Sequence, residues 1–388
     1  MHITLIDKNS YHTFYPDLYE VATAHIPETF GHLKIYFHEL MSTASIPFDD
    51  IFLNDLAVTV LKDEVVKIDF EKKEIALKNH ENKPYDLLVI GVGSEINYFN
   101  IPGLIEHALP LKNFTDALAV RNAIDELFAN SPKNHLIKIF VGGGGFSGCE
   151  FAGELVGFMK LLSKIHGRPE YYSECTIVEA SANLLNGATI STQEAAKKRL
   201  LSLGVKVLLN FPIKSVEDKK IILQDGNMAP FDLLIWTGGA RANDLAKTLA
   251  GVKLEKASCV AVDSFLRMMP YKTVFGLGDI TYCMDEKTGR PMPMTASVAL
   301  REAKFVAENI KRLILKKPLV PYKPHFAGLV VPLGKKYALF ESHGFHLAGF
   351  LPWVLKHFIS LHYFSTILDW QRAFIVWKRG IKIFTKND

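Results

Sequence analysis

Cysteine is scarce in this chain: only four of the 388 residues are cysteines, and no two of them form a CxxC pair or stand at the spacing of metal ligands. This scarcity excludes a thioredoxin-type redox pair, a zinc site and a disulfide framework, and it is typical of a reducing compartment. The four residues are Cys149, Cys175, Cys259 and Cys283.

Long apolar runs and an excess of charge are also missing. No stretch reaches the roughly 18 uncharged apolar residues that a spanning helix needs, and Met1 leads directly into a strand-like run where a signal peptide would stand. The formal net charge of +4 is too small to indicate a nucleic-acid partner. The sequence therefore predicts a soluble or peripheral protein, in which 48% hydrophobic residues allow a large core.

What the chain does contain is a series of apolar runs that alternate with helical patterns, which predicts α/β layering. The expected strands are 3–7, 86–90, 137–141, 175–179, 206–209, 233–237 and 274–276, and the expected helices are 114–129, 150–163, 192–203 and 295–315. We expect two Rossmann-like dinucleotide-binding domains, the first split by insertion of the second, followed by an amphipathic C-terminal segment. The expected limits are 1–112 with 246–325 for the split domain, 113–245 for the inserted domain and 326–388 for the C-terminal region.

The strongest single motif is a GxGxxG pattern made by Gly143, Gly145 and Gly148, directly after an apolar strand and at the start of a helix. Glycine at these places permits a tight turn, close approach of a pyrophosphate and close packing of helix on strand. The helix N-terminus then offers N–H groups and its dipole to the phosphates.

A second strand ends in Glu179. The spacing from the glycine motif to this acid is longer than the usual ~20 residues, and a loop-like insertion lies between them. A carboxylate there accepts hydrogen bonds from ribose hydroxyls and repels a 2′-phosphate, which favours NADH over NADPH. The alternative is an ordinary surface glutamate at the end of a strand.

Two further acids follow strands elsewhere in the chain. Asp7 ends an N-terminal strand that resembles the second strand of another dinucleotide fold. Asp279 follows a short strand and Gly278, where it could hydrogen-bond the ribityl chain or phosphate of a flavin or simply terminate a turn.

Together with Tyr11–Pro16, Tyr85–Val89, Asn97–Gly103 and Trp236–Gly239, these motifs make the chain resemble the type II NADH:quinone oxidoreductases, single-subunit flavoproteins with two dinucleotide-binding domains. The resemblance runs from Met1 to about Phe384. It implies FAD in the split domain, NADH in the inserted domain and a quinone as electron acceptor. The cofactor-binding positions that it implies are Asp7, Pro16, Gly93, Gly143, Gly145, Gly148, Glu179, Gly238, Gly239, Gly278, Asp279, Thr295 and Ala296.

The resemblance also places Glu150 on the acid that follows the phosphate loop, near the junction of nicotinamide and flavin. Its catalytic role there competes with a simpler one, that of a first-turn glutamate stabilised by the helix dipole. At the quinone side, Ser297 and Arg301 stand where the family typically carries glutamines, so we expect the quinone contacts to differ. The family's opening βα unit, with its glycine loop for FAD, has no counterpart here, and we expect a clipped start.

Aromatic and basic residues are interleaved through 345–388, as in an interfacial membrane-binding segment. The residues expected to contact lipid are Trp353, Lys356, Trp370, Arg372, Trp377, Lys378 and Arg379. A packed helix pair or a homodimer interface would use similar residues. The histidines of this segment lack a carboxylate or cysteine at ligand spacing, so we expect no metal.

The leading hypothesis is therefore an NADH:quinone oxidoreductase bound peripherally at the cytoplasmic face of the cell membrane. A sulfide:quinone oxidoreductase has the same architecture, but its chemistry needs cysteines beside the flavin, and no pair is evidently placed for that. A third possibility is a non-catalytic, membrane-associated NAD-binding protein with an incomplete FAD site.

Overall fold

The computed structural model describes residues 1–25, 33–53, 55–285 and 289–387. These residues form two compact units, each assembled from three stretches of the chain. Unit 1 contains Met1–Ser10, Phe52–Asn97 and Ala240–Phe326, and unit 2 contains Tyr11–Ile51, Tyr98–Gly239 and Ala327–Asp388. The chain therefore passes repeatedly between the two units, and residues 11–51, expected within the split domain, pack with unit 2.

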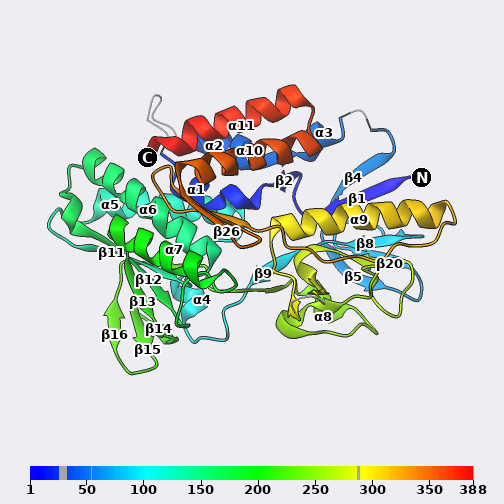
Figure 1. The fold of residues 1–388 in the computed structure, drawn as a ribbon, viewed down its shortest axis with the longest axis horizontal. Helices are drawn as coiled ribbons and strands as arrows, with labels where there is room; N and C mark the ends of the chain where they lie inside the picture. The colour runs from blue at the N-terminus through cyan, green and yellow to red at the C-terminus, as the bar shows by residue number, and fades with distance from the viewer. Residues whose placement is uncertain (26–32, 54, 286–288, 388) are drawn as a thin grey trace. The chain divides into compact units, whose positions relative to one another are not determined.

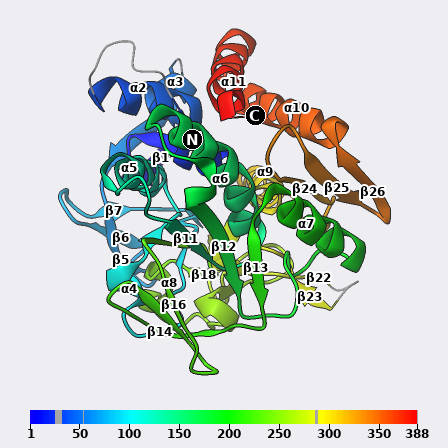
Figure 2. The same ribbon diagram turned by 90° about the vertical axis from the view of Figure 1, so that its left-hand side faces the viewer.

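The centre of unit 2 is a five-stranded sheet with the order β10-β17-β11-β12-β13, parallel throughout; Figure 2 shows its strands β11, β12 and β13. Strand β11 lies in the middle, and the order β13-β12-β11-β17 follows the 3-2-1-4 part of the pattern of a dinucleotide-binding domain; β10, which precedes β11 in the chain, takes the outer place beside β17. The strands are β10 (Leu109–Pro110), β11 (Ile137–Gly142), β12 (Ser173–Glu179), β13 (Lys206–Leu209) and β17 (Leu233–Trp236). The expected strands of this region are confirmed.

Three long helices pack against this sheet or its neighbours: α5 (Phe114–Asn130), α6 (Phe146–Ile165) and α7 (Ile190–Leu203). Asn113 caps α5 through a reciprocal capping box with Asp116. Apolar side chains such as Ile139, Phe151 and Leu155 are fully buried between the layers. An antiparallel sheet of β14 (Ile213–Glu217), β15 (Lys220–Leu223) and β16 (Met228–Pro230) precedes β17, and α4 (Leu104–His107) precedes β10.

The N-terminal part of unit 2 is a short helical layer. It contains β2 (Tyr11–Thr13), the single-turn helix η1 (Tyr15–Asp17), α1 (Leu18–Ala22), α2 (Leu33–Ala44), β3 (Ser45–Pro47) and α3 (Phe48–Ile51). Helix α1 is buried along its whole length and contacts both α5 and α6. This places the acidic residues of η1 and α1 inside the unit.

The C-terminal segment of unit 2 is folded onto the helices of the nucleotide-binding sheet. Its sheet of β24 (Leu329–Pro332), β25 (Ala338–Ser342) and β26 (Phe345–Gly349) leads into α10 (Phe350–Ile367) and α11 (Trp370–Phe384), which pack side by side (Figure 1). Arg199 of α7 donates to the carbonyl oxygens of Leu333 and Gly334, at 3.1 and 2.6 Å. Glu341 of β25 accepts from the backbone N–H and hydroxyl of Thr189, at 3.1 and 2.8 Å, at the start of α7. Four charge-assisted hydrogen bonds thus fix this segment to α7.

The parallel strands described in unit 1 form three separate pairs: β1 (Ile3–Asp7) with β4 (Val58–Lys62), β8 (Leu88–Ile90) with β20 (Val274–Gly276), and β19 (Val260–Ala261) with β21 (Thr281–Tyr282). The antiparallel strands β5 (Val65–Asp69), β6 (Glu74–Leu77) and β7 (Lys83–Pro84) form a sheet of their own, and β9 (Ser94–Ile96) pairs with β18 (Ala240–Ala242). Short elements complete the unit: α8 (Leu245–Thr248), η3 (Lys256–Ser258), η4 (Gly278–Ile280), β22 (Met284–Asp285) and β23 (Arg290–Pro291).

The one long helix described in unit 1 is α9 (Ala296–Ile314), which lies against the turn that follows β20. Thr295 is its N-cap residue, and the Thr295 side chain makes no capping hydrogen bond. The helix begins one residue later than the sequence predicts and ends one residue earlier. Its first turn therefore lies beside Gly278 and Asp279, the residues expected to hold a flavin.

Candidate functional site: a glycine loop and a buried ion cluster

The loop between β11 and α6 has the backbone shape that a dinucleotide phosphate requires. Gly143 has a φ of +103°, and a Cβ there would lie 2.5 Å from the Cα of Gly238. A Cβ on Gly148 would lie 2.0 Å from the carbonyl oxygen of Gly143. Gly145 differs, because a Cβ there would meet nothing within 4 Å. Two of the glycines thus let strand, turn and helix pack closely, and the third faces open space where a phosphate could approach the backbone.

Glu179 lies at the end of β12 with its carboxylate against this loop. One oxygen accepts from the backbone N–H of Gly144 at 2.6 Å, and the other accepts from the backbone N–H and hydroxyl of Ser181 at 2.8 and 2.6 Å. These bonds fix the carboxylate beside the open face of the glycine loop. Their geometry fits the ribose-binding acid of a dinucleotide site.

The segment after β17 closes the loop from the other side. The hydroxyl of Thr237 lies 3.0 and 3.1 Å from the carbonyl oxygens of Gly142 and Gly143, to which it donates. The Trp236 ring leaves no room for side chains at Gly142 or Gly238. Gly239, with a φ of +99°, then turns the chain out of unit 2. Sequence reasoning grouped these residues with the motif but assigned no role to Thr237.

Most of the expected flavin residues of unit 1 lie near Asp279. Gly278 turns the chain with a φ of +70°, and the hydroxyl of Ser94 donates to Asp279 at 2.5 Å. Gly93, next to Ser94, has a φ of +72° and open space around it. Thr295 and Ala296 begin α9 beside this turn. Asp7 is at the end of β1, where burial raises the pKa of its carboxyl.

Pro16 and the two quinone-side residues have separate surroundings. Pro16 lies in η1 and belongs to unit 2. Ser297 is exposed in the first turn of α9. The guanidinium of Arg301, one turn later, donates to the carbonyl oxygen of His325 at 2.7 Å.

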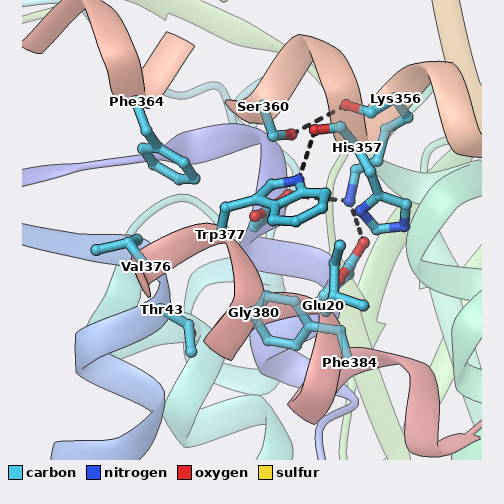
Figure 3. Close-up of a pocket in the computed structure, with 12 residues that line it drawn as sticks. Glu20, Thr43, Lys356, His357, Ser360, Phe364, Val376, Trp377, Gly380 and Phe384 are labelled. Atoms are coloured by element: carbon cyan, nitrogen blue, oxygen red, sulfur yellow. Dashed lines mark hydrogen bonds and ion pairs between the residues drawn. The ribbon is translucent and has the colours of Figure 1, made fainter. Parts of the chain in front are cut away.

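Glu150 belongs to a buried ion cluster in unit 2. The η1–α1 segment contributes Asp17 and Glu20, and α10 contributes Lys356; Glu20 and Lys356 are labelled in Figure 3. Glu150 of α6 is partly buried and is coupled to all three by electrostatic interaction. The ammonium of Lys356 lies 3.0 Å from Asp17 and forms a second ion pair with Glu20. Tyr19 donates its hydroxyl to Glu20 at 2.8 Å. More carboxyls than cations therefore share this part of the unit.

The crowding of carboxyls controls their protonation. Burial raises the pKa of Glu150 to about 8; Lys356 opposes that shift, and Glu20 and Asp17 reinforce it. Burial raises the pKa of Asp17 to about 6 in spite of Lys356. Burial would lower the pKa of Lys356, but the charges of Asp17 and Glu20 raise it well above its ordinary value. At neutral pH the cluster therefore contains a charged lysine and a glutamic acid that can carry a proton.

A pocket opens beside this cluster, between the N-terminal helical layer and the α10–α11 pair (Figure 3). One oxygen of Glu20 and Nε2 of His357 are buried there, and neither has a hydrogen-bond partner among the residues that the structure describes. The indole N–H of Trp377 donates to the carbonyl oxygen of His357 at 2.8 Å and forms part of the wall. Sequence reasoning did not single out Asp17 or Glu20. The sequence signal that could have indicated them is the presence of these two acids in the otherwise apolar segment 14–22.

Of the expected lipid contacts, Lys356 is buried and Trp377 is partly buried. Lys356 is only 8% exposed, because its ammonium is paired with Asp17 and Glu20 inside the protein. Trp377 turns its indole N–H inward to His357. Arg372 is partly buried and pairs with Asp369, and Trp353 packs edge-on against His357.

The remaining expected lipid contacts lie at the surface of α11. Trp370 is 62% exposed, and Lys378 and Arg379 are exposed. Large apolar side chains accompany them on the surface of the C-terminal segment. They are Phe345, Leu347, Phe350, Leu351, Leu355, Phe358, Ile359, Phe374 and Ile375. None of the helices described reaches the length and apolar character of a membrane span.

The chain belongs to the pyridine nucleotide-disulphide oxidoreductase family, whose model matches residues 2–303. Among curated relatives, a probable NADH dehydrogenase of Dictyostelium discoideum is 29% identical over 348 residues, which cover 82% of this chain and 75% of the relative. A type II NADH:quinone oxidoreductase of Haemophilus influenzae is 26% identical over 369 residues, covering 87% of this chain and 80% of the relative. The resemblance to type II NADH:quinone oxidoreductases that the motifs indicate is confirmed.

Solved structures show the same fold. NDH2 of Plasmodium falciparum, determined in complex with NADH, superimposes with a TM-score of 0.83 at 19% identity, covering 98% of this chain and 93% of that one. The sulfide:quinone oxidoreductase of Aquifex aeolicus superimposes with a TM-score of 0.73 at 20% identity, covering 99% and 86%. The chain therefore has the α/β flavoprotein fold of this family, with two C-terminal helices.

Proposed function

We propose that this chain is an NADH:quinone oxidoreductase that carries FAD, takes a hydride from NADH and reduces a quinone at a membrane surface. The observation that carries the proposal is the glycine loop of unit 2, whose Gly145 faces open space beside the fixed carboxylate of Glu179. The relatives are named as NADH dehydrogenases and type II NADH:quinone oxidoreductases. These names agree with NADH as the electron donor at that loop, and they indicate a quinone as the electron acceptor.

NADH is the nucleotide that fits unit 2. The N-terminus of α6 faces the phosphate position behind Gly145, and its dipole favours the diphosphate. Glu179 keeps about one lone-pair site, on Oε2, for a ribose hydroxyl beyond the three hydrogen bonds that it already accepts. A 2′-phosphate placed there would meet a like charge, so NADPH is the poorer substrate.

FAD is assigned to unit 1 on the chemistry of its donor set. Asp279 offers a carboxylate, Ser94 a hydroxyl and Gly93 an unobstructed positive-φ turn. The start of α9 at Thr295 and Ala296 directs a helix N-terminus toward the same place, which favours negative charge on a flavin ring. When bound, FAD would accept the hydride and pass the electrons on. We include Asp7 in this set and leave Pro16, which lies in unit 2, as the weakest member.

The proposed role of the ion cluster is to supply the proton that quinone reduction needs in addition to the hydride from NADH. Reduction of a quinone by NADH consumes one proton beyond the transferred hydride, since NADH, a proton and quinone give NAD⁺ and quinol. Glu150 is the candidate catalytic acid, because its pKa of about 8 keeps it protonated at neutral pH. Asp17, with a pKa of about 6, can receive a proton from solvent and lies electrostatically coupled to Glu150. Lys356 holds the cluster together by staying charged.

The C-terminal helices are the proposed contact with lipid. The exposed apolar side chains of α10 and α11 could each contribute roughly 1.5–3 kcal/mol on insertion, and Lys378 and Arg379 about 1 kcal/mol each near anionic headgroups. Binding would be peripheral and at the cytoplasmic face, where anionic lipid is found. Ser297 and Arg301 remain the proposed quinone-side residues of unit 1.

The test is an assay of the full chain, purified with FAD present throughout. We expect a yellow protein with flavin absorption, oxidation of NADH that depends on a short-chain quinone, and slower oxidation of NADPH. A colourless protein that binds NADH would instead identify a non-catalytic NAD-binding protein.

Sulfide offered as the donor in the same assay distinguishes the second candidate. The fold is compatible with it, but burial raises the pKa of Cys175 and of Cys283 to about 12, and burial also raises the pKa of Cys149 well above its ordinary value. Thiols that stay protonated are poor nucleophiles. We therefore expect no sulfide-dependent quinone reduction.

A further inference from the structure

Glu302 places a buried carboxyl beneath the proposed flavin turn. Glu302 lies in the second turn of α9 and is only 1% exposed. One oxygen of its carboxyl accepts a hydrogen bond from the backbone N–H of Gly278 at 2.6 Å. Gly278 also packs directly on this helix, since a Cβ there would lie 3.3 Å from that of Ala299. The carboxyl thus joins α9 to the turn that presents Asp279.

A charged carboxyl is costly at this position. The nearby cluster of Leu266, Phe275 and Val306 is apolar, and burying an ionised group among such residues is unfavourable without a partner. The charge of Asp279 adds to burial in raising the pKa of Glu302, whereas hydrogen bonds with the Gly278 amide and the Thr281 side chain lower it. The hydrogen bond to Gly278 is therefore the main interaction that favours the ionised form.

Other titratable groups face the same carboxyl. Cys283 and Tyr322 both feel its charge, which adds to burial in raising their pKa values, and Arg301 opposes that shift at Tyr322. Tyr322 packs against Phe305 of α9 with ring centroids 5.0 Å apart. Both the thiol and the phenol stay neutral at physiological pH, because burial and the charge of Glu302 raise their pKa values.

We propose that Glu302 is a positioning residue for FAD: its carboxyl holds the Gly278–Asp279 turn in place and takes up a proton from solvent when the cofactor binds. The inference rests on the flavin role proposed above for unit 1. A bound FAD brings diphosphate charge and covers the turn from water, and both effects disfavour a second buried anion. Burial already raises the pKa of Glu302 to about 7, so a modest further rise changes its protonation near neutral pH.

The experiment measures FAD affinity and proton uptake together. Protein stripped of flavin is titrated with FAD between pH 5.5 and 9 in weakly buffered solution containing an indicator dye. A rise of about one unit in the pKa of Glu302 predicts fractional proton uptake that is largest between pH 7 and 8. It also predicts about sevenfold weaker FAD binding at pH 8.5 than at pH 6.

Two variants separate this role from packing. Glu302→Gln keeps a hydrogen-bond acceptor for Gly278 but cannot titrate, so FAD binding should persist with a flat pH dependence and no proton uptake. Glu308→Gln is the matched control, because Glu308 lies on the same helix and pairs with Arg312 at the surface. It should behave like the unchanged protein.

The proposal is overturned if the unchanged protein binds FAD without taking up protons, a result that does not depend on any variant. It is also overturned if Glu302→Gln keeps the original pH profile. A protein that binds NADH but no FAD at any pH would sink the proposed function itself, and so is distinguishable from failure of this inference alone.

Discussion

Removing the single cation of the buried cluster should destabilise unit 2 in a pH-dependent way. Lys356→Met keeps the length of the side chain but leaves Asp17, Glu20 and Glu150 without a cation at the centre of the cluster. The unfolded chain solvates these carboxyls freely, whereas the folded chain must either bury their charges unpaired or protonate them. The expected cost is therefore the cost of protonation.

Its size follows from ordinary acid chemistry. A free glutamate has a pKa of about 4.3, so keeping one carboxyl neutral costs about 4 kcal/mol at pH 7.5 and about 2 kcal/mol at pH 5.5. The figure at the higher pH agrees with the ~3–5 kcal/mol typical of removing one partner from a buried ion pair. The sign is fixed as well: the folded-state pKa values rise in the variant, so its deficit in stability grows as the pH rises.

Tryptophan fluorescence during denaturation by urea measures this effect in the right place. The four tryptophans, Trp236, Trp353, Trp370 and Trp377, all belong to unit 2. Lys378→Met, on the exposed face of α11, is the matched control and should change the free energy of unfolding by less than about 0.5 kcal/mol. Adding Asp17→Asn to Lys356→Met should restore part of the loss. Equal deficits at pH 5.5 and 7.5, or a variant as stable as the control, would refute the reasoning.

Three further predictions concern nucleotide and lipid. Replacing Glu179 with Gln removes the like charge that faces a 2′-phosphate, so kcat/KM for NADPH relative to NADH should rise about tenfold; an unchanged ratio in steady-state kinetics would contradict the ribose assignment. Gly148→Ala should cost about 1–3 kcal/mol in a thermal melt because its Cβ collides with the backbone, whereas Gly145→Ala should fold normally and weaken NADH binding; equal melting temperatures for the two would count against the loop geometry. Changing both Phe358 and Trp370 to Ser should reduce sedimentation with anionic vesicles at least tenfold and leave NADH oxidation by a soluble quinone intact; undiminished binding would remove these helices from the lipid contact.

Much of the fold follows from local sequence pattern. Strands 3–7, 206–209 and 274–276 are found with the limits that their apolar runs predict, and α7 and α9 begin and end within two residues of expectation. Strand β20 is buried along its length and is a continuous apolar run, as expected of a parallel strand covered on both faces, whereas β1 and β13 are partly exposed. The glycine loop is also predictable, because glycine is demanded by backbone geometry that the motif itself encodes.

The ion cluster could not be predicted in the same way. Glu20 and Lys356 lie more than three hundred positions apart in the chain, and no local pattern connects them. Lys356 stands in an aromatic, basic segment and so carries the signature of a lipid-facing residue. Its burial is decided by the carboxyls that tertiary packing brings to it, since a lysine is buried only where a partner compensates its charge.

The C-terminal segment has one further consequence for how the molecule would sit on a bilayer. A protein joined to its lipid-binding part by a linker can tumble above the surface, and its active groups sample every orientation. Here Arg199 and Glu341 bind the C-terminal sheet to α7, and Lys356 binds α10 to α1, so α10 and α11 are continuous with the nucleotide-binding core. Insertion of their exposed faces would fix the height and tilt of the glycine loop above the headgroups, and NADH would approach that loop from one constant direction.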